Sequence, residues 1–150
     1  MIDQKIHIFI DGVVNYFKYA NSGVEATVGS PYLIDSVEQI GSDYTGRVSV
    51  SGAYEGFCCF TAPTILLKHL IMSLGESDTS DEMVMDAVGE VANILSGNAR
   101  EHLGKDFIIS VPEVIRGKPY ADSQCSEQRV YAIPINWKSY RALLAVCLYQ

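Results

Sequence analysis

The stretch from Asp81 to Gly104, DEMVMDAVGEVANILSGNAREHLG, most constrains the fold because its pattern predicts one long helix with two unlike faces. At about 100° per residue, Asp86, Glu90, Asn93 and Gly97 fall within roughly 60° of one another. The opposite face is apolar and is expected to be buried. It consists of Val84, Val88, Val91 and Leu95, with Ala92 and Ala99 beside them. The polar face combines short side chains with glycine, which costs about 1 kcal/mol of helix propensity relative to Ala. We therefore expect another molecule to approach this face closely.

Composition and charge limit the classes of function. The 150 residues are expected to form a single domain, 1–150, large enough to bury a sizeable core. The net charge of −7 argues against binding to nucleic acid or to an anionic membrane, since both attract basic surfaces. No apolar run has the length of a membrane span, and the N-terminal residues do not resemble a signal peptide. A cytoplasmic location is therefore expected.

The cysteines do not form a pattern typical of a metal site. Cys58 and Cys59 are adjacent in a predicted strand, whereas Cys125 and Cys147 lie far along the chain, and the three histidines are in separate segments. This spacing argues against zinc, so no metal site is expected and the cysteines are interpreted as buried free thiols. The role of the adjacent pair stays open.

Hydrophobic periodicity and turn residues predict an α+β fold, with a mostly antiparallel sheet and two long helices packed on it. The helix from Asp81 is preceded by Thr79, which has capping-box spacing to Glu82. Thr61 is the expected N-cap of another helix, and Pro112 should mark an edge or a bulge in its strand. The other expected elements are a helix from Ile6 to about Ala20 that ends at Asn21, Ser22 and Gly23, an interrupted strand within 26–34, a hairpin of strands 44–51 and 56–61, a helix ending at Leu74, a strand over 107–115, and a closing hairpin of strands 129–135 and 140–148.

The order of these elements, together with the helix motif, resembles the CheX-type chemotaxis phosphatases, which are grouped with CheC and the flagellar-switch phosphatases. The resemblance rests on three stretches: SGAYEGFCCFTAPTILLKHLIMSLGE, DAVGEVANILSGNAREHLG and IISVPEVIRGK. Glu90 and Asn93 match the family's Glu-x-x-Asn, Asp86 matches an upstream acidic or Ser position, and Gly97 matches a downstream glycine. Pro112 is the candidate for a proline that follows the motif. One copy of the motif is present, as in CheX-type members, which dimerise.

The resemblance implies hydrolysis of the aspartyl phosphate on a phosphorylated CheY-like receiver domain. The chain needs no cofactor of its own, because the receiver supplies Mg²⁺. A neutral carboxamide can position the attacking water without repelling an anionic transition state, and this role falls to Asn93. Glu90 would pair with the receiver's active-site lysine. Asp86, Gly89 and Gly97 are expected to contact the partner.

Two other functions remain compatible with the residues. A non-catalytic, CheX-like dimeric module could bind a receiver in two-component signalling through the same helix. A small-ligand sensor could use a pocket in the dimer. Glu90 and Asn93 could also be ordinary polar residues of a solvated face. The substrate receiver and the pathway are not named by any motif, and the homodimer is expected from the family alone.

Overall fold

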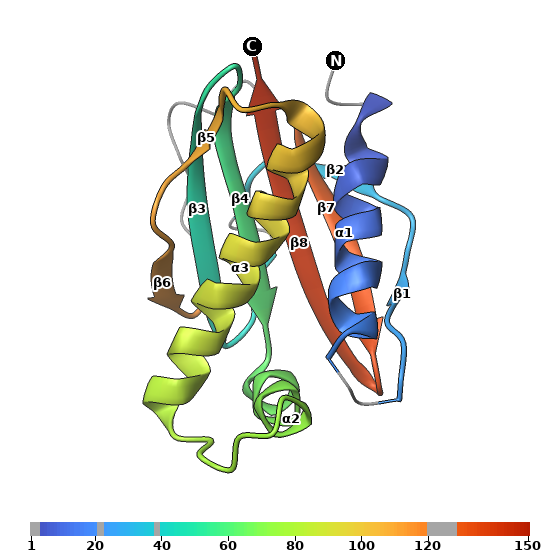
Figure 1. Ribbon diagram of the computed structural model, residues 1–150, viewed down its shortest axis with the longest axis vertical. Coiled ribbons are helices and arrows are strands. Elements are labelled where there is room, and N and C mark those ends of the chain that lie inside the picture. Colours follow the sequence, from blue (N-terminus) through green and yellow to red (C-terminus); the bar gives the residue numbers. More distant parts are fainter. Residues whose placement is uncertain (1–3, 21–22, 38–39, 120–128) are drawn as a thin grey trace.

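The computed structural model describes residues 4–20, 23–37, 40–119 and 129–150, which form helices on one face of an antiparallel sheet (Figure 1). The expected α+β class is confirmed. The helices are α1 (Ile6–Lys18), α2 (Thr64–Ser73) and α3 (Asp81–Leu103). The strands are β1 (Thr27–Val28), β2 (Tyr32–Ile34), β3 (Tyr44–Gly52), β4 (Glu55–Ala62), β5 (Phe107–Ile109), β6 (Glu113–Arg116), β7 (Val130–Trp137) and β8 (Tyr140–Tyr149).

The sheet runs in the order β1-β7-β8-β4-β3-β5, with β2 also pairing with β7 and β6 with β3. The two hairpins, β3–β4 and β7–β8, meet at the β4–β8 pairing, where Cys58 faces Val146 across the strands. In Figure 1, α3 crosses in front of β3 and β4, α1 lies in front of β7 and β8, and α2 lies at the lower end of the sheet. Antiparallel pairs need only short turns, which suits a chain built from consecutive hairpins.

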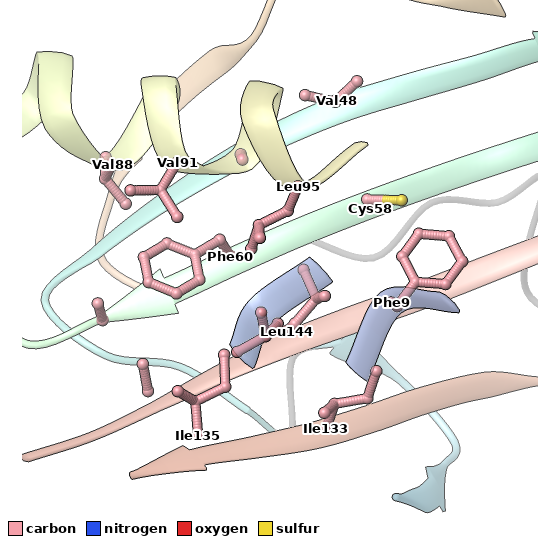
Figure 2. Packing of buried hydrophobic residues seen from close by; sticks show 14 of the residues in the cluster. Phe9, Val48, Cys58, Phe60, Val88, Val91, Leu95, Ile133, Ile135 and Leu144 are labelled. Carbon is pink, nitrogen blue, oxygen red and sulfur yellow. The ribbon is translucent and has the colours of Figure 1, made fainter. Parts of the chain in front are cut away.

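The main core lies between the helices and the sheet (Figure 2). The side chains of Val88, Val91 and Leu95 point from α3 towards Phe60 of β4. The whole face of α3 that was predicted to be apolar is buried, which confirms the helical period read from the sequence. An amphipathic stripe of this kind must be covered, and here the sheet covers it.

A second cluster covers the outer face of the sheet and shows how the adjacent cysteines are placed. Cys58 belongs to the core under the helices, whereas Cys59 belongs to the outer cluster with Phe57 and Cys147. Successive residues of a strand point to opposite faces, so the pair divides between the two layers. The cysteines in the described part, Cys58, Cys59 and Cys147, are buried thiols that form no disulfide bond, as expected, whereas Cys125 lies outside the described residues.

Gly46 lets α3 lie close to β3. A methyl group at this position would collide with the carbonyl oxygen of Val88 and press on the side chain of Ala92. A glycine inside a strand often marks such an approach of another backbone. The close contact fixes the height of α3 above the sheet, and with it the position of the helix's outer face.

Both predicted helix caps were wrong in detail. Thr61 stays in β4, where its hydroxyl donates to the carbonyl oxygen of Tyr44, and α2 begins at Thr64. The amide of Thr64 donates instead to the carboxylate of Asp43, at 2.8 Å. In α3 the N-cap is Ser80, so the capping-box position falls on an apolar residue and the Thr79–Glu82 box does not form.

Several strands differ from their expected bounds. The predicted strand 107–115 is divided into β5 and β6, both paired with β3, because Pro112 lacks the amide needed to continue the ladder. The strand expected within 26–34 is likewise divided into β1 and β2, which both pair with β7. The closing hairpin turns through two residues, Lys138 and Ser139, with Lys138 at φ 56°, so its strands are longer than predicted. The first helix ends at Lys18, slightly before the expected Ala20. Of the three residues expected to end it, Gly23 has a positive φ of 73°, whereas Asn21 and Ser22 lie outside the described residues.

Candidate functional site

The outer face of α3 carries the residues singled out from the sequence. Asp86, Glu90 and Asn93 are exposed, and Gly97 is half-buried on the same side. The hydroxyl of Ser80 accepts the amide of Met83 at 3.4 Å and caps the helix. Asp81 and Glu82 in the first turn, with Arg100 and His102 in the last, complement the helix dipole. The motif therefore lies in the middle of a capped helix of 23 residues that is buried along its opposite side.

The two glycines of this helix lie in different surroundings. A methyl group at Gly97 would meet no atom within 4 Å, so this position is open to an approaching molecule. Gly89 is buried, and a methyl group there would come within 3.0 Å of Val114 Cγ2 and 3.7 Å of Pro112 Cβ. The absence of a side chain at Gly89 therefore serves packing inside the molecule, and its expected contact with a partner stays a prediction.

Pro112 borders one side of the motif. It lies between β5 and β6 and packs over Gly89, the residue before Glu90. The proline that the sequence suggested as part of the motif is thus adjacent to it in space. The ring of Pro112 and the side chain of Val114 hold the middle of α3 against the edge of the sheet.

The first helix borders the other side of the motif and supplies a residue that the sequence reasoning missed. Tyr16 of α1 lies beside α3, where its burial, followed by the negative charge of Glu90, raises its pKa from 10.0 to about 12. Its phenol is therefore a neutral hydroxyl near a carboxylate over the physiological pH range. Gly12 lies where the two helices meet, and a methyl group there would be in ordinary van der Waals contact with Asn98 Cβ, at 3.8 Å. The helical period of α1 could have indicated a buried face, but not that Tyr16 approaches Glu90.

Two hollows open along the seam between the helices. The larger, of about 400 Å³, lies between α1 and α3 and includes Asp11, Asn98 and Glu101 among its lining residues. The smaller, of about 180 Å³, lies where α1, α2 and α3 meet, and both Asp86 and Glu90 line it. Tyr16 and Leu74 line both hollows, so the two form one groove beside the motif. We call the combined surface the three-helix groove.

The layer beneath the motif is buried and chemically inert. The hydroxyl of Ser96 is buried in α3 and donates to the carbonyl oxygen of Ala92 at 2.8 Å. Cys58 lies below it, and burial raises the pKa of this thiol from 9.0 to about 12, although a hydrogen bond with Ser96 acts in the opposite direction. A thiol held neutral in this way is a poor nucleophile. The chemistry available at the motif is therefore that of the exposed carboxylates of Asp86 and Glu90 and the carboxamide of Asn93.

Two structural findings concern metals and membranes. In the described residues, no group of three or more His, Cys, Asp or Glu side chains has an arrangement that could hold a metal ion. No helix in the same part of the chain combines the length and the apolar character needed to cross a membrane.

Comparisons with known proteins agree in family and in fold. A family model described as "Chemotaxis phosphatase CheX" matches residues 44–136. A CheC-like superfamily protein from Shewanella sp. PV-4 is 26% identical over 97% of each chain, with a TM-score of 0.82. A chemotactic CheC-like protein from Shewanella oneidensis MR-1 is 25% identical, with a TM-score of 0.82 and coverage of 99% of this chain and 100% of the other. Among curated proteins, no match is found.

A more distant structure shares the fold. It is the CheX–CheY–BeF3–Mg²⁺ complex from Borrelia burgdorferi, in which the matched chain is 20% identical, with a TM-score of 0.73 and coverage of 97% of each chain. The stretch matched by the family model contains all five site residues predicted from the sequence: Asp86, Gly89, Glu90, Asn93 and Gly97.

Proposed function

The chain belongs to the CheX family of chemotaxis phosphatases, and from that premise we propose that it hydrolyses the aspartyl phosphate of a phosphorylated CheY-like receiver domain. The observation that carries the proposal is the pair Glu90 and Asn93, exposed one turn apart on a rigid helix inside the stretch that the family model matches. The Borrelia burgdorferi protein, a CheX in complex with CheY, BeF3 and Mg²⁺, supports a receiver as the partner. In this proposal, Mg²⁺ belongs to the receiver.

Asn93 is the proposed catalytic residue. Its carboxamide can accept a hydrogen bond from a water molecule and donate one, and so hold that water in line with the phosphorus. The water oxygen bonds to phosphorus, and the bond from phosphorus to the receiver's aspartate oxygen breaks. The aspartate leaves as a carboxylate, and both protons of the water stay on the inorganic phosphate that is released. The amide is neutral and does not repel the negative charge on the transferring group.

Glu90 is proposed to fix the receiver in register. Its carboxylate would repel a phosphoryl group directly, so a cationic side chain of the receiver, its active-site lysine, is the suitable contact. Asp86 is exposed one turn before Glu90 and extends this acidic contact. Gly97 is open and lets the partner's backbone approach the helix. Gly89 is buried, so its role in the proposal is to hold α3 against Pro112.

The test compares the decay of phosphorylated receivers with wild-type protein, three site variants and one control variant. Asn93→Ala should lower the accelerated rate on the order of 100-fold, because positioning of the water is lost. Asn93→Asp keeps the shape but adds a charge that repels the phosphoryl group, so it should be as impaired. Glu90→Ala should raise KM more than it lowers kcat. Glu82→Ala is the matched control, an exposed glutamate in the first turn of the same helix.

Binding measured in parallel separates the enzyme from a non-catalytic module. If Asn93→Ala loses hydrolysis but still binds the receiver, the catalytic role is supported. If the wild type binds receivers without accelerating the decay of any of them, the phosphatase proposal fails and a dimeric binding module explains the site. The expected homodimer is part of the proposal for either function, and it is tested separately by mass measurement in solution.

A further inference from the structure

The three-helix groove is open beside the proposed catalytic helix and has an apolar floor. Leu74 at the end of α2 lines both of its hollows and is 56% exposed, and Tyr19 at the end of α1 is 80% exposed. The apolar side chains lining the smaller hollow are Leu70, Ile71, Leu74, Met83 and Ala87. Large exposed apolar side chains that line a concave surface are typical of a contact site.

The rim of the groove is acidic. The carboxylates lining it are Asp11, Glu76, Asp86, Glu90 and Glu101, all of them exposed. Neither Lys nor Arg is among the described residues that line either hollow, and His102 is the one histidine among them. Such a surface attracts a partner that presents positive charge around an apolar side chain.

We propose that the three-helix groove binds a basic segment of the receiver, with an apolar side chain inserted between α1, α2 and α3 and Lys or Arg side chains at the acidic rim. This inference rests on the proposed function. The groove is continuous with the motif, because Asp86 and Glu90 line the smaller hollow. A receiver engaged at Glu90 therefore covers this hollow as well. The groove sets which receiver is bound, whereas Asn93 carries the chemistry.

The charge of the chain disfavours a second copy in the groove. A second copy of the chain also carries a net charge of −7, so its surface is acidic on average. An acidic surface placed against the acidic groove is repelled, because like charges that face one another oppose association. The phosphorylated receiver needs cationic groups near its phosphorylation site if it is to pair with Glu90. Further Lys or Arg side chains of the same receiver segment would pair with Asp11, Glu76 and Glu101 at the rim.

Two pairs of variants test the proposal by the kinetics of receiver dephosphorylation. Leu74→Ser removes the exposed apolar side chain shared by the hollows, and Met72→Ser is its control, 50% exposed on the same helix but lining neither hollow. Glu101→Gln removes one rim charge. Glu55→Gln is its control. Glu55 is exposed at the start of β4, on the face of the sheet that points away from the helices and from the groove.

We expect Leu74→Ser to raise KM about fivefold with kcat unchanged, as for removal of one well-packed contact residue. Glu101→Gln should raise KM about twofold at low ionic strength and have no effect at high salt, because salt screens exposed charges. Met72→Ser and Glu55→Gln should behave as the wild type. Equal KM values for Leu74→Ser and wild type, or an equal effect of Met72→Ser, would overturn the proposal.

Binding of a receiver loaded with beryllofluoride and Mg²⁺, measured by calorimetry, keeps this inference separate from the phosphatase proposal. If the wild type binds the loaded receiver but does not hydrolyse phosphorylated receiver, the phosphatase proposal fails. Weaker binding of the loaded receiver by Leu74→Ser would still support the groove as the docking surface. If Leu74→Ser binds the loaded receiver as tightly as the wild type does, the groove is not the docking surface. Native mass spectrometry gives a further test. If the wild type retains a small molecule at one per chain and Leu74→Ser loses it, the groove is a small-molecule site and the docking proposal is overturned.

Discussion

Replacing Gly97 by alanine should make the protein more stable, because glycine at this position has no packing function inside the molecule. A methyl group there meets nothing within 4 Å, and Gly97 lies well inside α3. Removing the extra backbone freedom of glycine in a helix contributes about 0.5–1 kcal/mol. For a domain of this length, that corresponds to an increase of about 2–3 °C in Tm.

Gly89→Ala is the matched comparison, since it is the same substitution in the same helix. Its methyl group would lie 3.0 Å from Val114 Cγ2, which is closer than carbon atoms normally pack. Val114 would have to move, and the strain of an overfilled contact offsets the gain in helix propensity. We therefore expect no net stabilisation, or a loss of up to about 1 kcal/mol.

Urea unfolding followed by circular dichroism measures both variants against the wild type. The Gly97→Ala midpoint should rise with an unchanged m-value, and the Gly89→Ala midpoint should not. The same Gly97→Ala protein should hydrolyse phosphorylated receiver with a higher KM, because the methyl group stands where the partner approaches. A less stable Gly97→Ala protein would refute the open position of Gly97. Equal stabilisation by Gly89→Ala would refute the close contact with Val114.

Four further predictions follow from the structure. Folding raises the pKa of Tyr16 from 10.0 to about 12, so the stability that the neutral phenol contributes is complete below pH 10 and is lost as the pH rises towards 12. Urea midpoints of the wild type should therefore fall over this pH range, and those of Tyr16→Phe should fall less. Cys58 should resist iodoacetamide at pH 8 in native protein and react after unfolding, as read by peptide mass spectrometry, because burial raises its pKa to about 12. Asp43→Ala removes the acceptor for the Thr64 amide and should lower the free energy of unfolding by about 1 kcal/mol in urea, and an unchanged midpoint would contradict this capping role. Light scattering should give twice the chain mass of 16.5 kDa, and a single chain mass at micromolar concentration would contradict the homodimer.

The periodic elements were predictable because their physical signal is local. The 3.6-residue period of α3 separates Val88 and Leu95 from Glu90 and Asn93, and that separation needs no knowledge of what covers the helix. The hairpin of β3 and β4 was also predictable, because two strand-like stretches are separated by a short turn that begins at Gly52 and ends before Gly56. The exposure of the motif could therefore be predicted from the sequence alone.

The caps and strand ends were not predictable because several residues compete for each role. Thr61 has the right chemistry for an N-cap, but its hydroxyl is used in the sheet, and Asp43, 21 positions from Thr64, provides the acceptor. Such a long-range contact leaves no spacing signal. Ser80 and Thr79 are both good N-cap residues, and only the path of the backbone selects Ser80.

The sequence by itself determined that one helix would carry a carboxylate, a carboxamide and a glycine on its outer side, because side-chain direction in a helix follows from residue number alone. Only the tertiary structure decided that Gly89 faces Pro112 and Val114 while Gly97 faces open space, since two glycines of one helix look alike until their neighbours are known. It also decided that Tyr16 and Leu74, from helices far apart in the chain, meet beside Glu90 to form a groove. Periodicity is a property of neighbouring residues, whereas a groove exists only where separate segments are brought together by packing.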